Sequence, residues 1–273
     1  MQPADPFMQR SHLLGFIGAG AMAKAMIQGV LQSQAYAPTQ IACCSATGRT
    51  SQALSKQTGI ACLANAADIV ASCDTVVIAC KPLELEHIGP VATAPHKPLI
   101  MSVLARRSLQ DLRKHFPDAR VVVRCMPNTP VRIGFGMIPY SVETPLNPPD
   151  LETLHSILKA LGSCLEMPES DLPAATALSG CGPAYYFKFT EALCQAAIAQ
   201  GLSPSIAAHL AKQTALGAAQ LMQTSQESIP ELIKEVAHPG GITESALAYL
   251  DKQHFDTIIK EMIATTAHHA QSF

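Results

Sequence analysis

Two glycine-containing segments, at residues 18–23 and 239–243, combine residue types at spacings that could do chemistry. The first is Gly18-x-Gly20-x-x-Ala23, which lies between a short apolar run and a segment compatible with a helix. In that context Gly18 allows a tight turn, Gly20 lets a pyrophosphate approach the backbone, and Ala23 keeps helix and strand close. The helix N-terminus adds free N–H groups, which favour phosphate. The segment predicts a dinucleotide site, although an ordinary strand-to-helix turn is compatible with the same residues.

The second segment is Pro239-Gly240-Gly241-Ile242-Thr243. A Gly-Gly turn that opens a helix presents unpaired backbone N–H groups, which can hold a carboxylate without an arginine. We expect Gly240 and Gly241, with the turn around His238, to bind such a group. Thr243, in the first helical turn, then has its hydroxyl within reach of the bound molecule. The alternative is a plain interhelical turn with Thr243 as a capping residue.

A polar loop follows the strand predicted at residues 40–45 and bears on cofactor choice. Sites selective for NAD carry an acidic residue there, but this chain has no Asp or Glu between Asp5 and Asp68. Instead, Ser45 begins a hydroxyl-rich loop that contains Arg49. A guanidinium pairs with phosphate through a fork of donors, so we predict NADPH as the preferred cofactor, with NADH possible. A solvated Arg49 in a polar loop is the alternative.

Two further loops follow predicted strands. Lys81-Pro82 comes after the strand expected at residues 74–80, where we interpret the lysine as a neighbour of the nicotinamide ribose rather than a catalytic acid. Asn128 lies between two prolines after the strand expected at 120–126, at the edge where open α/β sheets bind ligands. The residues that we assign to the cofactor site are Gly18, Gly20, Ala21, Met22, Ser45, Arg49, Asn65, Lys81, Pro82 and Asn128.

Alternating strand and helix signals surround these loops as far as residue 168. They predict an α/β fold in which helices make the crossovers of a parallel, doubly wound Rossmann-type sheet. From residue 171 strand signals vanish and Ala/Leu-rich helices follow, at 183–200, 204–222 and after Ser228. We predict a flexible tail at 1–12, a cofactor domain at 13–168 and an all-α domain at 169–273.

The predicted helices are apolar on more than one face. Such a surface is expected to be buried partly in a second subunit, which predicts a homodimer or a higher homo-oligomer through the C-terminal helices. A self-contained helical bundle is the alternative.

Composition limits the function classes. The net charge is −2 and there is no basic block, so we expect a small-molecule substrate and no nucleic-acid partner. No apolar run is long enough for a membrane span, and the first dozen residues do not look like a secretion signal. The nine cysteines include no C-x-x-C pair and the ten histidines show no metal-binding spacing. We therefore expect no metal site and a reducing, cytoplasmic location.

Taken together, the motifs resemble the pyrroline-5-carboxylate reductase family over roughly residues 13–265. The resemblance implies reduction of Δ1-pyrroline-5-carboxylate to L-proline with NAD(P)H, the final step of proline biosynthesis, by a Rossmann domain followed by a helical dimerisation domain. It also makes Thr243 the candidate hydrogen-bond donor to the ring nitrogen. The matching segments are Phe16–Ala23, Lys81-Pro82, Arg124–Pro130, Leu178–Tyr185 and Pro239–Thr243.

The chain departs from that family at Cys181 and His238, where serine is usual or common. Cys181 is a weaker hydrogen-bond donor, and His238 could make substrate binding more dependent on pH. Two other functions stay open at this point. A β-hydroxyacid dehydrogenase would use a catalytic lysine on its long interdomain helix, where Lys188 lies, and a non-catalytic NADP sensor would keep only the cofactor domain.

Overall fold

A computed structural model describes residues 12–88, 91 and 97–271 of the chain. Apart from His12, which begins the first strand, the predicted tail lies outside the described residues. Within the described part, eight strands form a single sheet in the order β3-β2-β1-β4-β5-β6-β7-β8. The strands are β1 (His12–Ile17), β2 (Ile41–Cys44), β3 (Ala61–Cys62), β4 (Cys73–Ile78), β5 (Leu99–Ser102), β6 (Val121–Cys125), β7 (Gly136–Val142) and β8 (Gly162–Glu166).

Strands β1 to β6 are parallel, so their carboxyl ends meet at one edge of the sheet. Strand β1 is central: Leu14 pairs with Ile41 of β2 on one side and with Thr75 of β4 on the other. The prediction of a parallel sheet is wrong at β7, which runs antiparallel to β6. Only residues 126–135, which include the 3-10 turn η2 (Thr129–Ile133), separate β6 from β7, and a parallel return needs a longer crossover.

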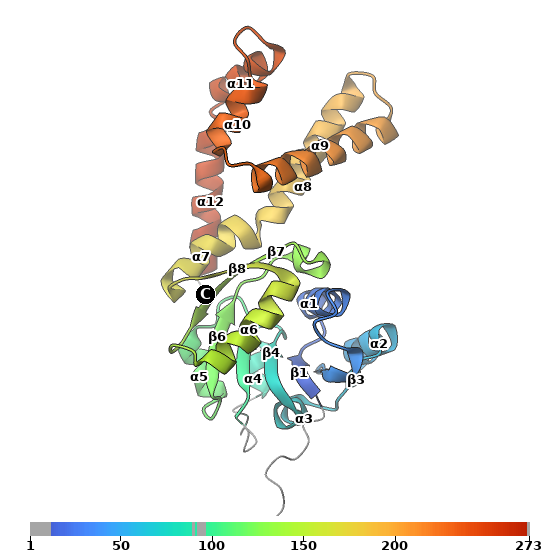
Figure 1. Cartoon of the computed structure of the whole chain (residues 1–273), viewed down its shortest axis with the longest axis vertical. Coiled ribbons are helices and arrows are strands. Elements are labelled where there is room, and N and C mark those ends of the chain that lie inside the picture. Colours follow the sequence, from blue (N-terminus) through green and yellow to red (C-terminus); the bar gives the residue numbers. More distant parts are fainter. Residues whose placement is uncertain (1–11, 89–90, 92–96, 272–273) are drawn as a thin grey trace, which may run out of the picture. The chain divides into compact units, whose positions relative to one another are not determined.

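Helices cover both faces of this sheet (Figure 1). Adjacent residues of a strand point to opposite faces, so Phe16 and Cys43 belong to one core cluster, and Ile17 and Cys44 to the other. The first cluster includes residues of α1 (Ala21–Gln32), α2 (Arg49–Thr58) and α6 (Pro148–Leu161). The second includes residues of α3 (Ala66–Ser72), α4 (Glu84–Ile88) and α5 (Leu109–His115).

Short helical turns follow the last strand. They are η3 (Glu169–Asp171), α7 (Leu172–Ala175) and η4 (Thr176–Gly180), of which η4 is a π-helical turn. Another 3-10 turn, η1 (Pro38–Gln40), precedes β2. The chain divides into two compact units, and the first extends to Cys181 and also takes in Ala267–Phe273, whereas the second comprises Gly182–Thr266. The predicted domain boundary at residue 168 stays a prediction.

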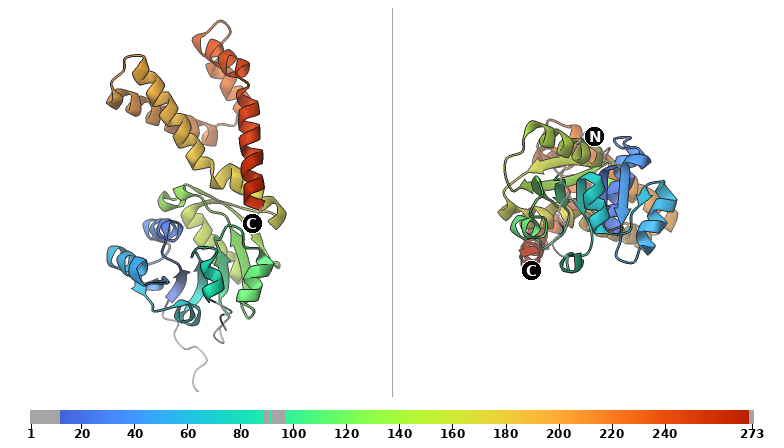
Figure 2. Two further views of the ribbon diagram at one scale, coloured as in Figure 1. Left: turned by 180° about the vertical axis from the view of Figure 1, so that it is seen from behind. Right: turned by 90° about the horizontal axis from the view of Figure 1, so that it is seen from below.

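Long helices make up the second unit, in which α8 and α9 lie side by side as a hairpin (Figure 2). Ser203 caps α9 as predicted, since its side chain accepts the N–H of Ile206. In the described part of this unit, the buried apolar side chains are only Cys194, Ala207 and Leu232. The helices are α8 (Gly182–Ala199), α9 (Pro204–Thr224), α10 (Ile229–Val236), α11 (Ile242–Lys252) and α12 (Phe255–Gln271), whose last residues belong to the first unit.

Large apolar side chains on these helices are exposed in the single chain. Phe187 is 68% exposed, Leu210 51% and Ile258 56%, and each belongs to a different helix. A unit that buries so few apolar side chains by itself gains little from the hydrophobic effect. Its apolar faces therefore need a cover that one copy of the chain does not supply.

Candidate functional site

The turn after β1 has the shape that the glycine motif predicts. Gly18 has a φ of +111°, and a Cβ there would lie 2.5 Å from the backbone of Ala79. Gly20 is the N-cap of α1, and a Cβ on it would have no heavy atom within 4 Å. Helix α1 has neither an acidic residue in its first turn nor a side-chain cap. Its N-terminus thus combines open space with uncapped backbone donors, including those of Ala21 and Met22, which fits a pyrophosphate.

The loop after β2 is held together by its own hydroxyls. The Oγ atoms of Ser45 and Ser51 are 2.9 Å apart, Ser45 Oγ accepts the N–H of Ser51, and Ser51 Oγ donates to the carbonyl of Gly48. Gly48 has a φ of +71° and is the N-cap of α2, which begins at Arg49. Arg49 is exposed, and α2 has no acid in its first turn. This loop therefore presents an exposed guanidinium at a helix N-terminus that its N-cap residue, Gly48, does not cap and at which Ser45 Oγ accepts one N–H, that of Ser51.

Asn65, Lys81 and Pro82 also follow parallel strands. Asn65 caps α3 through its side chain, which accepts the N–H of Asp68. Lys81 is exposed, and its backbone N–H donates to Glu84. The structure thus brings the predicted cofactor residues to the carboxyl edge of the sheet, where parallel strands of an open α/β fold bind ligands.

Asn128, at the same edge after β6, is 8% exposed. Its Oδ1 accepts the backbone N–H of Met137 at 2.9 Å, and its Nδ2 donates to the carbonyl of Ser179 at 3.0 Å. One amide N–H of this side chain remains beyond those two hydrogen bonds. The assignment of Asn128 to the cofactor stays a prediction, but most of its hydrogen-bonding capacity is used by the protein itself.

The predicted substrate residues lie on the turn between α10 and α11, in the second unit. The expectation that Gly240 and Gly241 present unpaired N–H groups is wrong in this structure. Gly241 N–H donates to the carbonyl of His238 at 3.0 Å, and Gly240 N–H donates to the Glu244 carboxylate at 2.7 Å. The cause is a tight turn at Gly240, whose φ is +77°, followed by a glutamate in the first turn of α11.

Thr243 lies in that first turn and is half-buried, whereas His238 is exposed. The N–H groups of a first helical turn have no partners within the helix. The turn therefore keeps helix N–H donors and a hydroxyl beside the carboxylate of Glu244.

Several cysteines behave as small apolar side chains. Burial raises the pKa of Cys43 and Cys73 to about 12, and that of Cys44 and Cys80 to about 11. A thiol with such a pKa is protonated at neutral pH and is a poor nucleophile. All nine cysteines are free thiols.

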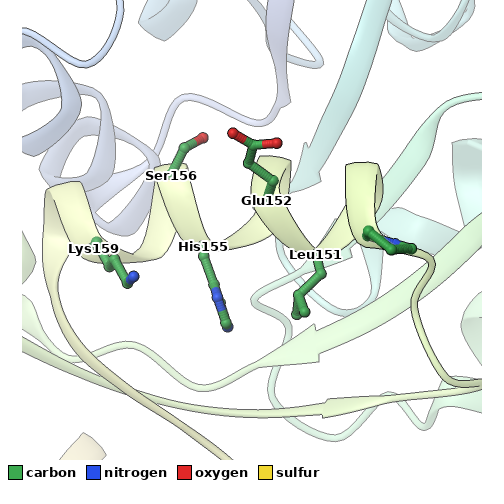
Figure 3. A pocket seen from close by; sticks show the side chains of 6 residues that line it. Leu151, Glu152, His155, Ser156 and Lys159 are labelled. Carbon is green, nitrogen blue, oxygen red and sulfur yellow. The ribbon is translucent and has the colours of Figure 1, made fainter.

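A shallow hollow of about 380 Å³ beside α6 contains none of the predicted site residues (Figure 3). All of its lining side chains come from this one helix, including His155, Ser156 and Lys159. Over the described residues, there is no group of three or more His, Cys, Asp or Glu side chains that could hold a metal. In that same part of the chain, no helix is both long and apolar enough to cross a membrane.

Sequence reasoning missed residues that hold these loops in place. Arg107 donates from Nη2 to the carbonyl of Pro82 at 2.9 Å and from Nη1 to Glu86 at 2.6 Å. Arg124 donates to Glu169 at 3.0 Å, and Glu169 also accepts the N–H of Leu109. Partners so far apart along the chain leave no local signal in a single sequence.

Comparisons with known proteins agree with this geometry. The family model described as pyrroline-5-carboxylate reductase dimerisation matches residues 169–273, and that described as NADP oxidoreductase coenzyme F420-dependent matches residues 13–106. The chain is 33% identical over 259 residues to a pyrroline-5-carboxylate reductase of Synechocystis sp., covering 94% of this chain and 97% of that protein. It is 32% identical to that of Pseudomonas aeruginosa, covering 92% of each.

Solved structures show the same likeness. The NADP-bound pyrroline carboxylate reductase of Plasmodium falciparum superposes with a TM-score of 0.83 at 26% identity, over 96% of this chain and 98% of that one. The pyrroline-5-carboxylate reductase of Coxiella burnetii gives a TM-score of 0.85 at 26% identity, over the same shares of the two chains.

Proposed function

The chain belongs to the pyrroline-5-carboxylate reductase family, and from this premise we propose how its own residues carry out the reaction. It is an enzyme that reduces Δ1-pyrroline-5-carboxylate to L-proline, the final step of proline biosynthesis. NADPH supplies the hydride that is transferred to C5 of the imine ring. The protein itself must bind the cofactor and the imine, align the two for hydride transfer, and allow the ring nitrogen to be protonated.

The cofactor lies, in this proposal, along the carboxyl edge of the sheet. The N-terminus of α1 holds the pyrophosphate, with Gly18 and Gly20 leaving room for it and Ala21 and Met22 beginning the helix. The remaining groups on this edge contact the rest of the dinucleotide. They are Ser45, Arg49, Asn65, Lys81 and Pro82. Asn128 lies at the same edge, but its side chain is hydrogen-bonded to Met137 and Ser179.

The 2′-phosphate is bound at the start of α2. Arg49 supplies a positive charge there, and the first turn of α2 supplies the backbone donors that Ser45 does not occupy. The hydroxyl network of Ser45 and Ser51 keeps this loop in one conformation. NADH lacks the phosphate, so it does not make these interactions and binds more weakly.

The carboxylate of the imine binds at the turn before α11. This carboxylate replaces Glu244 as the acceptor of the Gly240 N–H and also accepts hydrogen bonds from the free N–H groups of the first helical turn. His238 lies beside it. Thr243 Oγ1 then donates a hydrogen bond to the ring nitrogen as that atom gains electron density. A threonine hydroxyl is too weak an acid to supply the proton alone, so water or prior protonation of the imine completes the step.

The second unit makes the contact between subunits. The match of residues 169–273 to a dimerisation family supports homo-oligomerisation, and we propose a dimer in which the apolar faces of α8 to α12 cover one another. The nine free thiols support a reducing compartment, the cytoplasm. We propose no nucleic-acid partner, since the chain carries a net charge of −2.

The observation that carries these site assignments is the uncapped glycine turn of α1 in a chain whose relatives are pyrroline-5-carboxylate reductases. Crystals soaked with NADPH and tetrahydrofuran-2-carboxylate, a proline analogue without the ring nitrogen, test them directly. We expect the pyrophosphate at residues 18–22 and the analogue's carboxylate at Gly240. An analogue bound far from Gly240 would remove the proposed roles of Gly240, Gly241 and Thr243.

A further inference from the structure

Asn128 and Arg124 connect the segment at residues 169–179 to β6 and to the loop that follows β6. Arg124 holds the start of this segment through Glu169, and Asn128 holds its end through the carbonyl of Ser179. Both side chains are about nine-tenths buried. These hydrogen bonds lie within the first unit, and the chain enters α8 at Gly182, shortly after Ser179.

The end held by Asn128 is a π-helical turn, η4, which follows directly on α7. Such turns shift backbone carbonyls out of the regular α-helical ladder and often occur at functional sites. Within this turn, Ser179 Oγ donates a hydrogen bond to the carbonyl of Ala175, and Cys181 N–H donates to the carbonyl of Thr176. The Ser179 carbonyl itself accepts from Asn128, so one buried side-chain amide links residues 178–181 to the loop after β6.

The place of this hydrogen bond connects it to the reaction. Asn128 follows β6 at the carboxyl edge, the same edge that carries the glycine turn after β1. We propose that Asn128 is a positioning residue for hydride transfer, which holds the Leu178–Cys181 backbone against this edge and thereby sets the alignment of imine and nicotinamide. This role rests on the proposed placement of the cofactor along that edge. It differs from a cofactor contact because it acts through Ser179.

The test is Asn128→Asp, which retains the acceptor for Met137 N–H but loses the donor for Ser179 when it is ionised. Above the pKa of the introduced acid, a carboxylate faces a carbonyl oxygen, and we expect kcat to fall about ten- to hundredfold. When the acid is protonated it donates again, so the ratio of variant kcat to wild-type kcat should rise as pH falls from 8.5 to 5.5. A loss of folding would not be reversed in this way. Asn128→Ser, which is too short to reach Ser179, should show the same fall without the dependence on pH.

NADPH affinity separates this role from a cofactor contact. The fluorescence of NADPH, which is excited at wavelengths where protein side chains do not absorb, reports its Kd. We expect the Kd of the Asn128→Asp variant to stay within about twofold of wild type while kcat falls, because binding and alignment are distinct contributions. A matched control is Asn147→Asp, since Asn147 likewise accepts a backbone N–H through Oδ1, that of Asp150 at 2.9 Å, and donates from Nδ2, to the Asp150 carboxylate at 3.0 Å.

Each outcome decides the matter. A fall in kcat that acid reverses, at constant NADPH Kd, supports the positioning role. A weakened NADPH Kd in step with the loss of kcat makes Asn128 a cofactor ligand and overturns it, while leaving the proposed cofactor site intact. Unchanged kcat in both Asn128 variants, or an equal loss in Asn147→Asp, also overturns it. A failure of the cofactor site itself would appear in the NADPH Kd of the Arg49 variant described below.

Discussion

The carboxylate of Glu244 accepts the backbone N–H of Gly240 at 2.7 Å, so an internal anion lies where we propose that the substrate's carboxylate binds. Both groups carry one negative charge and need the same donor. The substrate must therefore displace Glu244, and the departing product allows Glu244 to return.

Replacing Glu244 by glutamine should lower the KM for the imine about three- to tenfold, because a neutral amide competes less strongly for the N–H and does not repel the incoming carboxylate. Steady-state kinetics at saturating NADPH measures this. Glu231→Gln is the matched control, since Glu231 accepts the N–H of Ser228 at the same distance of 2.7 Å before α10. An unchanged or raised KM in Glu244→Gln would show that Glu244 is not displaced.

Thr243→Ala should lower kcat/KM about 100-fold, the usual loss when one donor to a developing charge is removed. Thr243→Ser keeps the hydroxyl and should remain within about threefold of wild type. Measurement of kcat and KM for both variants distinguishes the loss of the donor from a change in packing. A fall of less than about twofold in Thr243→Ala would exclude the proposed donor role.

Arg49→Ala should raise the KM for NADPH about tenfold or more and leave the KM for NADH unchanged, because only NADPH has the phosphate that the guanidinium pairs with. The NADPH Kd from fluorescence should weaken by the same factor. Lys56→Ala is the control, since Lys56 is an exposed cation in the last turn of the same helix. Equal effects on both cofactors, or none on NADPH, would place the phosphate elsewhere.

Gly29→Ala should destabilise the first unit by about 1–3 kcal/mol. A Cβ on Gly29 would overlap the carbonyl oxygen of Val131 and lie 2.7 Å from Leu161 Cδ2, so α1 and η2 would have to separate. Urea unfolding followed by circular dichroism gives the change in free energy. Lys24→Ala, on the exposed face of the same helix, should change it by less than about 0.5 kcal/mol, and a similar effect of both variants would contradict this account.

The free energy of unfolding should fall as pH rises above about 9. Burial raises the pKa of Cys43 and Cys73 to about 12, whereas the same thiols titrate near 8.5 in the unfolded chain. Below that pH the two thiols are protonated in both the folded and the unfolded state, and their full contribution to the free energy of unfolding is present. Above it, the unfolded state loses protons that the folded state retains, so unfolding becomes more favourable.

Urea midpoints measured between pH 7.5 and 10 test this dependence. Cys73→Ala should reduce the slope, whereas Cys62→Ala should leave it unchanged because Cys62 is exposed. A slope that is the same in all three proteins would assign the pH dependence to other groups.

Local rules let the sequence by itself determine much of this protein. Gly18 and Gly20, a strand followed by a helix, and the absence of acid before Arg49 predict the cofactor edge, because parallel strands bring their carboxyl ends together wherever they pair. Even the acceptor of the Gly240 N–H is close in sequence, since Glu244 lies in the first turn of the helix that follows. A glutamate at the third position of a helix is a recognised capping signal.

Only the tertiary structure decided which distant groups meet. Asn128 pairs with the carbonyl of Ser179, Arg124 pairs with Glu169, and Arg107 holds Pro82, although each pair is far apart along the chain. Such partners are selected by burial and packing of the whole sheet, and neither hydrophobic period nor turn chemistry encodes them.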